Sequence, residues 1–265
     1  MSGNALMKTF IVRLVGICIL ATAQPSYAMV RHVAFFAPPV PLEEFDGWYF
    51  NTHSMECIRY YGAWLRRYET YRAQSVPEEA NRFHVYRGRY TELWYDSADA
   101  FREAAPNDRA YTPARWGGIS TAEQPTVRLL VPAMPTEDFL GKSPLPSSGP
   151  FLRMLIAVKY PAGVSHADGE KWYLAVHAQE EKKLPGLLRY VSYHVVPNSP
   201  LASPWVRLTE LWFKSYADWK TAMLQTSVAF TAPPWAQAGR EWLDTATTFV
   251  SDLPDRDFLA ASAHR

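Results

Sequence analysis

The chain repeats its own sequence, and this feature constrains its fold more than any other. The run TELWYDS at Thr91–Ser97 returns as TELWFKS at Thr209–Ser215. Four more blocks return in the same order at a spacing of roughly 120 residues: Trp48-Tyr49 with His53 as Trp172-Tyr173 with His177, Leu65–Tyr68 as Leu187–Tyr190, Ala110–Thr112 as Ala229–Thr231, and Val131–Leu140 as Val250–Leu259. Chance does not preserve the order of five blocks, so we predict a tandem duplication.

The stretch between the two copies, residues 141–150, is rich in Pro, Gly and Ser, a composition typical of a linker. We therefore expect a first repeat at residues 29–140 and a second at residues 151–265.

Residues 1–28 have the layout of a secretory signal peptide. Two basic residues precede an apolar run at Leu14–Ala23, and small residues follow it. About ten apolar residues are fewer than the roughly 20 that span a bilayer, so no stable membrane anchor is expected. We expect a periplasmic or secreted protein, or a cytoplasmic one if translation starts at Met29.

Each copy has the hydrophobic periodicity of a β-α-β-β-α-β unit, with the first helix ending at His53 or His177. The predicted strands are residues 30–37, 65–72, 89–95 and 126–131, and residues 152–160, 187–196, 206–213 and 245–250. A four-stranded antiparallel sheet with both helices on one face leaves its other face apolar and in need of a second layer. We expect an α+β fold in which two ferredoxin-like βαββαβ repeats pack sheet to sheet as an intramolecular dimeric α/β-barrel. The chain would be a monomer with an internal pseudo-dimer, with further oligomerisation open.

Composition narrows the class of partner. The 27 Lys and Arg balance 26 Asp and Glu, and no basic block occurs, so nucleic acid and anionic membrane surfaces are not expected partners. Two cysteines form no metal-ligand pattern, and we expect no metal site. The 14% aromatic content suits a pocket for a small hydrophobic or aromatic molecule, or equally the filling of the core.

The second copy resembles the EthD family of dimeric α/β-barrel proteins. The resemblance rests on Val158–Ser165, Trp172-Tyr173, Val176–Ala178, Leu184–Tyr190, Tyr193–Val196 and Glu210–Phe213. The first copy is more divergent, with Phe35 in place of Lys159 and without the Leu-Pro-Gly turn. The resemblance implies a ferredoxin-like fold without a cofactor. It also implies several roles: dehydratases or decarboxylases in aromatic polyketide pathways, an accessory role in ether degradation, and cofactor-free oxygenases in related families.

His53 and His177 are the first catalytic candidates, because imidazole can carry protons in either direction near neutral pH. They recur at the same place in both copies, at the end of a predicted helix. The alternative is that each histidine caps its helix, where its charged form favours the helix dipole.

The second predicted strand of each copy adds polar candidates on one face, because side chains alternate along a strand. This face carries Tyr190, Ser192 and His194 in the second copy and Tyr68, Thr70 and Arg72 in the first. Spacing alone leaves open whether it looks toward the helices or toward the other sheet.

Glu92 and Glu210 lie inside predicted strands, where a charge must be paired or used. Arg67, Arg189 or Lys159 could pair with them, and Lys159 could instead hold a carboxylate or phenolate.

We therefore expect a cofactor-independent lyase, a dehydratase or decarboxylase, acting on a small apolar and aromatic substrate. The candidate catalytic residues are His177, His53, Tyr190, His194 and Glu210. The candidate substrate-binding residues are Trp172, Tyr173, Trp212, Lys159, Trp48, Tyr49, Tyr68, Arg72, Glu92 and Trp94. The alternatives are a binding or accessory protein of a catabolic pathway and a cofactor-free oxygenase.

Overall fold

The computed structural model describes residues 29–106, 115–116, 119–120, 126–141 and 149–260. The predicted signal peptide, residues 1–28, and linker residues 142–148 lie outside this range, as does the repeated block Ala110–Thr112. Within the described residues no helix is long and apolar enough to cross a membrane.

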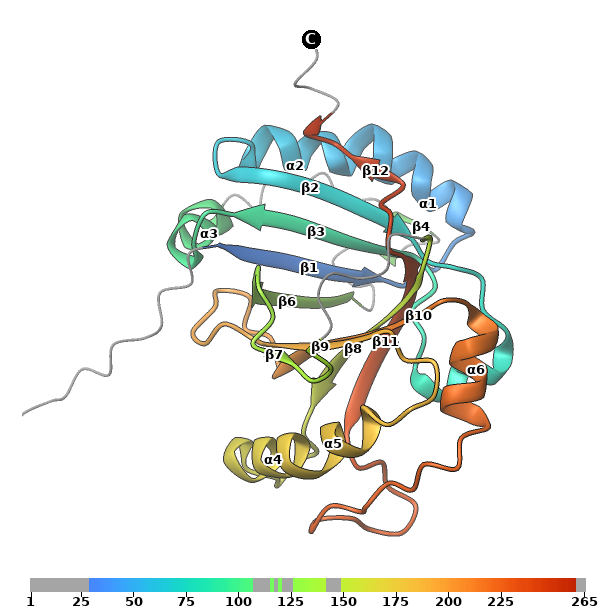
Figure 1. The fold of residues 1–265 in the computed structure, drawn as a ribbon. Coiled ribbons are helices and arrows are strands. Elements are labelled where there is room, and N and C mark those ends of the chain that lie inside the picture. Colours follow the sequence, from blue (N-terminus) through green and yellow to red (C-terminus); the bar gives the residue numbers. More distant parts are fainter. Residues whose placement is uncertain (1–28, 107–114, 117–118, 121–125, 142–148, 261–265) are drawn as a thin grey trace, which may run out of the picture.

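Two five-stranded antiparallel sheets form the centre of the molecule, and helices cover their outer faces (Figure 1). The first sheet has the order β12-β2-β3-β1-β6 and the second β11-β8-β10-β9-β7. The first-sheet strands are β1 (Val30–Phe36), β2 (Leu65–Arg72), β3 (Arg89–Tyr95), β6 (Thr126–Pro132) and β12 (Arg256–Asp257). The second-sheet strands are β7 (Glu137–Asp138), β8 (Leu152–Lys159), β9 (Arg189–His194), β10 (Arg207–Phe213) and β11 (Asp244–Ser251). Strands β4 (Arg115–Trp116) and β5 (Ile119–Ser120) pair separately.

The same element order occurs in both halves, which agrees with the expected α+β class. The first half has α1 (Leu42–Trp48), the π-helix η1 (Tyr49–His53), α2 (Ser54–Tyr61), the 3-10 helix η2 (Glu78–Phe83) and α3 (Ala98–Ala104). The second has α4 (His166–Trp172), the π-helix η5 (Tyr173–His177), α5 (Ala178–Glu181) and α6 (Tyr216–Leu224). Ser97 and Ser215 cap α3 and α6 through their side chains.

The prediction that the paired histidines end their helices is wrong. After His53 the chain continues in helical conformation as α2, and after His177 it continues as α5. A π-helical turn at this point contains an extra residue, so the apolar spacing loses its phase and imitates a helix end. Neither histidine caps a helix C-terminus.

Short tails cross between the halves, which the predicted repeat boundaries do not anticipate. The tail after β6 pairs as β7 with β9 of the second sheet, and the tail after β11 pairs as β12 with β2 of the first. Each tail places a phenylalanine against a buried tyrosine of the other half: Phe139 lies 4.5 Å from Tyr190, and Phe258 lies 4.6 Å from Tyr68, between ring centroids. Each half therefore supplies an edge strand and a phenylalanine ring to the other half.

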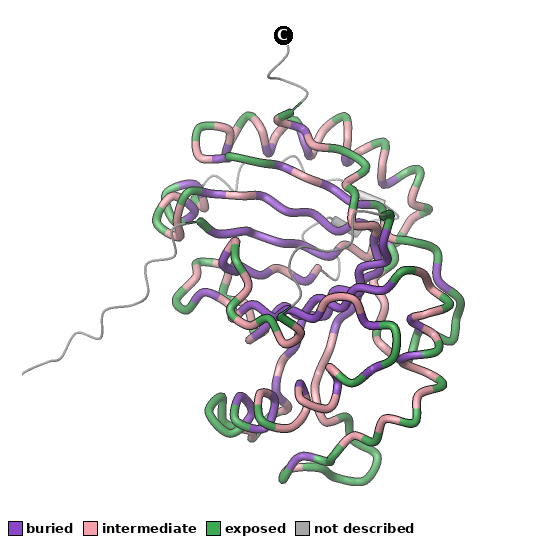
Figure 2. The backbone as a smooth tube through the Cα atoms, in the orientation of Figure 1, coloured by how far each residue is buried: buried purple, intermediate pink, exposed green. Residues whose placement is uncertain are grey.

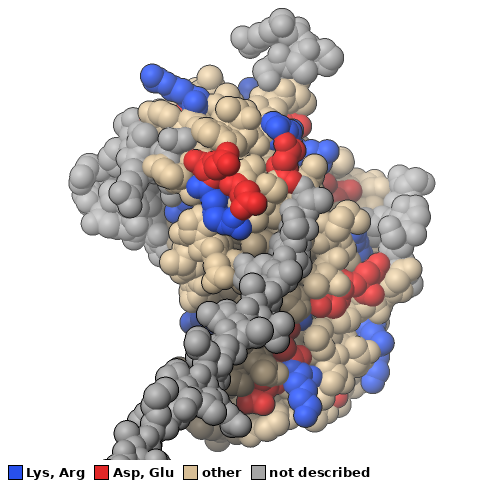
Figure 3. Space-filling model, turned by 90° about the vertical axis from the view of Figure 1, so that its left-hand side faces the viewer, with Lys and Arg blue, Asp and Glu red and all other residues tan. Residues whose placement is uncertain are grey.

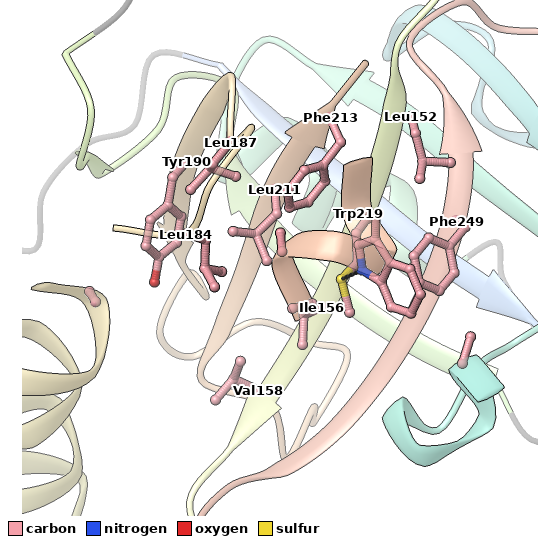
Figure 4. Close-up of a cluster of buried hydrophobic side chains, with 14 of the residues drawn as sticks. Leu152, Ile156, Val158, Leu184, Leu187, Tyr190, Leu211, Phe213, Trp219 and Phe249 are labelled. Atoms are coloured by element: carbon pink, nitrogen blue, oxygen red, sulfur yellow. Dashed lines mark hydrogen bonds between the residues drawn. The ribbon is translucent and has the colours of Figure 1, made fainter. Parts of the chain in front are cut away.

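Three apolar layers hold the structure together, and burial follows the central strands (Figure 2). One lies between the two sheets, and the other two lie between each sheet and its own helices. Figure 4 shows the layer of the second half, where Trp219 of α6 packs beside Phe249 and Tyr190 lies farther along the sheet. Because Tyr190 and Tyr68 belong to the helix-side layers, the face of the second strand that carries them looks toward the helices.

Candidate functional site

His177 lies at the end of the π-helix η5, among aromatic rings that pack over the outer face of the second sheet. Its ring stacks on Trp172 at 5.2 Å between centroids and an interplanar angle of 27°. Tyr173 lies at 5.3 Å and Phe230 at 5.8 Å. Trp172 in turn contacts Trp235. π-Helical turns of this kind occur often at functional sites, since they alter the direction of a side chain within a helix.

The two nitrogens of His177 have different surroundings. Nε2 lies 3.5 Å from Oε2 of the buried carboxylate of Glu181, one helical turn later. Nδ1 is buried, and no hydrogen-bond partner lies within reach of it among the described residues. When the imidazole is neutral, the carboxylate favours the tautomer that carries its proton on Nε2, which leaves a lone pair on Nδ1.

A chain of buried hydroxyls lies beneath this histidine. The hydroxyl of Tyr173 lies 3.3 Å from that of Tyr190 and 2.8 Å from that of Thr209. Burial raises the pKa of Tyr173 to about 12. Burial also raises the pKa of Tyr190 well above its ordinary value, and the charge of Glu181 adds to this. Both phenols therefore stay protonated at neutral pH and can donate hydrogen bonds.

The first half has a corresponding arrangement around His53. His53 stacks on Trp48 at 4.8 Å, and the hydroxyl of Tyr49 lies 3.1 Å from that of Tyr68. Where the second half has Glu181, the first has Cys57, whose sulfur lies 3.6 Å from Nε2 of His53. A thiol is a weaker hydrogen-bond partner than a carboxylate. The ring of His177 is therefore held more firmly by its neighbour than the ring of His53.

His194 belongs to a different cluster from His177. Its Nε2 lies 3.0 Å from Glu137 and 3.3 Å from Glu170, and Arg207 bonds to both carboxylates and to the histidine. Glu137 comes from the crossing tail, and in the first half Arg89 binds Asp46 and the tail residue Asp255 in the same way. These buried arginines join the halves.

Glu92 and Glu210 lie between the sheets and not at either histidine. Their buried ion-pair partners are Arg31 and Arg153, so the predicted pairing with Arg67, Arg189 or Lys159 is wrong. The predicted partners have other contacts: Arg67 with Glu69 and over the Trp94 ring, Arg189 over the Trp212 ring, and Lys159 with Asp244.

The remaining candidates divide in the same way. The ring of His177 contacts Trp172 and Tyr173, and that of His53 contacts Trp48 and Tyr49. Tyr190 and Tyr68 lie one step farther, at the hydroxyls of Tyr173 and Tyr49. Trp94 and Trp212 lie beside the intersheet charges. Arg72 is paired with Glu43 on the surface, 2.6 Å away.

Sequence reasoning missed several residues of the His177 site: Glu181, Phe230, Trp235 and Trp242. The sequence could have indicated Glu181, because it follows His177 by four residues and residues four apart share a helix face. The three aromatic residues come from the irregular segment between α6 and β11, where no periodicity points to a contact.

Two hollows are prominent in the described part of the chain, and neither is lined by His53 or His177. The larger, of about 480 Å³, lies against β1 and α3 of the first half, and the other, of about 380 Å³, lies by the loop after β9. Among the described residues, no group of three or more His, Cys, Asp or Glu side chains could hold a metal ion.

Comparison with known proteins adds a partial sequence match. Residues 41–113 match the sequence model of the chalcone isomerase N-terminal domain, a stretch that contains Trp48, His53 and Tyr68. No curated protein matches the chain. The match lies in the first half of the chain.

Solved structures resemble the whole chain. An anthrone oxidase-like protein aligns with a TM-score of 0.50 and 12% identity, covering 84% of this chain and 91% of its own. A mutant chlorite dismutase from Candidatus Nitrospira defluvii aligns with a TM-score of 0.43 and 11% identity, covering 84% and 91%. The sheet order and the likeness to the anthrone oxidase-like protein concern the fold alone. The chain has the dimeric α/β-barrel fold.

Proposed function

We propose that the protein is a cofactor-independent lyase, and that His177 is its proton carrier. The observation that carries this proposal is the pair of unequal nitrogens: Glu181 lies 3.5 Å from Nε2, while Nδ1 is buried without a described partner. A neutral imidazole held in this way can act as a general base at neutral pH.

The proposed reaction needs only proton transfers at one histidine. In a dehydration, Nδ1 of His177 takes the proton from the carbon next to a carbonyl group. The C–O bond of the neighbouring carbon then breaks, and the imidazolium gives the same proton to the leaving hydroxide. The products are an alkene and water, and the histidine returns to its neutral form. Tyr190 and Tyr173, which stay protonated, would stabilise developing negative charge through the hydroxyl chain.

The substrate that fits this surrounding is small, apolar and aromatic. Trp172, Phe230 and Trp235 offer ring faces beside the histidine. The similarity of residues 41–113 to a chalcone isomerase domain supports an aromatic substrate, because a chalcone carries two aromatic rings. Phe230 and Trp235 come from the segment between α6 and β11, so a movement of this segment would open a path to His177.

Origin and location form part of the same proposal. The recurrence of element order, of the paired buried tyrosines and of the stacked histidine supports a tandem duplication of an EthD-like unit, with repeats at residues 29–140 and 151–265. Export to the periplasm or beyond the cell follows from residues 1–28. N-terminal sequencing of the purified protein tests it, and an intact Met1 would contradict it.

A turnover screen tests the reaction. Purified protein is incubated under anaerobic conditions with aromatic β-hydroxy ketones and aromatic hydroxy acids, and the products are read by mass spectrometry. We expect a loss of about 18 mass units for dehydration or about 44 for decarboxylation. The variant His177→Asn should lower kcat by roughly a hundredfold to ten-thousandfold. The matched control is His166→Asn, an exposed histidine on α4, which should leave turnover unchanged.

Glu181 is a positioning residue in this proposal. Glu181→Gln should lower kcat and leave KM nearly unchanged, because the carboxylate that favours the Nε2 tautomer is gone. If His177→Asn turns over substrate as fast as the unaltered protein, the proposal fails.

The alternative of a binding or accessory protein is favoured by one observation, the position of the larger hollow away from both histidines. Ligand binding without any mass change in the same screen would support it. Oxygen uptake that depends on substrate would instead support the cofactor-free oxygenase.

A further inference from the structure

The larger hollow has a buried floor of aromatic side chains and one histidine, which belong to none of the sites described above. It measures about 480 Å³ and lies between β1, β6, α3, the end of α2 and the loop after β9. His32, Tyr61 and Phe101 form the buried part, with 8%, 5% and 4% of their surface exposed. The ring of His32 lies 5.4 Å from that of Phe101. A hollow of this size falls within the range of small-molecule sites.

The corresponding place in the second half is filled. Trp219 of α6 stands where α3 has Phe101, and Met154 of β8 stands where β1 has His32. The indole Nε1 of Trp219 lies 3.1 Å from the sulfur of Met154, and both residues are fully buried. Phe83 from the first half packs on the other side of this indole, at 5.5 Å.

The first half receives a smaller residue at this point. Leu201, from the loop after β9, packs against the layer that contains Phe101 and lines the hollow. A phenyl ring in place of an indole and a leucine in place of a phenylalanine remove volume from the same place. The hollow is the space that these two exchanges leave.

The lining of the hollow also carries positive charge. Arg102 of α3 and Arg128 of β6 both belong to it. In the second half the residue at the position of Arg128 is Thr247, which is buried. Arg102 binds the exposed Asp99 on its own helix, and this surface pair is solvent-screened. The described lining therefore combines an aromatic floor with two arginines and carries no acidic side chain.

We propose that this hollow binds a small aromatic carboxylate. Its ring lies on the floor between Phe101 and Tyr61, and its carboxylate faces the arginines. Charged hydrogen bonds from arginine to a carboxylate are strong and directional, and the apolar floor excludes water from one side of them. The site is separate from His177, so it does not depend on the proposed lyase activity.

The probe is 4-fluorocinnamate, and its binding to the full chain is followed by fluorine NMR and calorimetry. We expect saturable one-site binding at least tenfold tighter than that of 4-fluorocinnamamide, which has the same shape without the charge. Phe101→Trp should weaken binding at least tenfold, because the indole of the second half fills this space. Arg102→Gln should weaken binding of the acid severalfold and leave that of the amide unchanged.

Controls separate this site from the other proposal and from misfolding. His177→Asn should bind the probe like the unaltered protein, whatever its turnover. The double variant His32→Met with Phe101→Trp supplies both residues of the filled half, so it provides a second test if the single variant is unstable. Equal affinity for acid and amide, unchanged binding in the folded double variant, or no saturation at millimolar probe would each overturn the proposal.

Discussion

The guanidinium of Arg31 lies 3.3 Å from a carboxylate oxygen of Glu210, although the two residues belong to opposite sheets. Arg31 also binds Glu92 of its own sheet at 3.1 Å, and Arg153 binds both carboxylates from the other side, at 3.2 and 3.1 Å. These four residues form an ion cluster at the centre of the apolar intersheet layer. Any other alignment of the sheets would leave charges buried and unpaired, at high cost in free energy.

Removing one charge from the ion cluster should destabilise the protein strongly. Glu210→Gln leaves Arg31 and Arg153 with a single carboxylate between them, so we expect the free energy of unfolding to fall by about 3–5 kcal/mol. Urea denaturation followed by circular dichroism measures this. Asp96→Asn, which breaks the exposed pair with Arg66, is the control and should cost less than about 1 kcal/mol. A similar small loss for Glu210→Gln would contradict the expectation.

Acid should weaken the fold through the same cluster. Burial opposes the ionisation of Glu210, but the guanidinium groups of Arg153 and Arg31 outweigh it and lower its pKa to about 2. In the unfolded chain the carboxyl has its ordinary pKa of about 4.3. The folded protein therefore binds fewer protons, and its stability is fully present above that ordinary value and lost as the pH falls toward 2.

Urea midpoints measured from neutral pH down to about pH 3 give this dependence. Glu210→Gln has no carboxyl to protonate, so its midpoints should fall less over the same interval. Parallel curves for the two proteins would show that Glu210 does not carry the effect.

Two helix glycines should respond in opposite directions to alanine. At Gly169 of α4 an added Cβ would lie 2.4 Å from the ring of Tyr160, whose hydroxyl binds Glu170, so we expect Gly169→Ala to cost about 1–3 kcal/mol. At Gly47 of α1 nothing lies within 4 Å, so Gly47→Ala should raise stability by about 0.5–1 kcal/mol through helix propensity. Thermal unfolding of the two variants compares them. A stabilising effect at Gly169 would show that Tyr160 moves aside freely.

Cys57 should resist thiol reagents in the folded protein. Only 2% of its surface is exposed, and its sulfur lies against His53 within the helix-side layer. In a protein that starts at Met29, where Cys57 is the one cysteine, we expect negligible reaction with Ellman's reagent in buffer and one thiol per chain in guanidinium chloride. Rapid reaction without denaturant would show that this layer opens readily.

Charge on the surface agrees with the composition argument. Figure 3 shows acidic and basic side chains interspersed on the face that it presents, with neither sign gathered into a patch. Nucleic acid and anionic membrane surfaces therefore gain no support from this face.

The strands and the layers were readable from the sequence because they depend on local periodicity. The runs at 30–37, 89–95 and 206–213 predict β1, β3 and β10 to within one residue at each end. The repeated blocks further predict that both sheets are built alike, and the apolar face that the helices leave open on each sheet requires a partner. Recurrence also pointed to His53 and His177, and in the structure each of them stacks on a tryptophan.

Tertiary structure alone decided which groups meet. A π-helical turn departs from the 3.6-residue spacing of apolar residues in an α-helix. The sequence therefore indicated, wrongly, that the helices end at the histidines. The ion-pair partners of Glu92 and Glu210 are Arg31 of β1 and Arg153 of β8. Each arginine lies within a mostly apolar run, so the sequence did not indicate it as a partner. The exchange of tails and the hollow beside His32 arise from contacts between residues far apart in the chain, and no local pattern encodes such distances. The sequence by itself determined the strands, the layers and the recurring histidines. Packing decided that Glu181 lies against His177, that arginines neutralise the central carboxylates, and that one half retains space which an indole fills in the other.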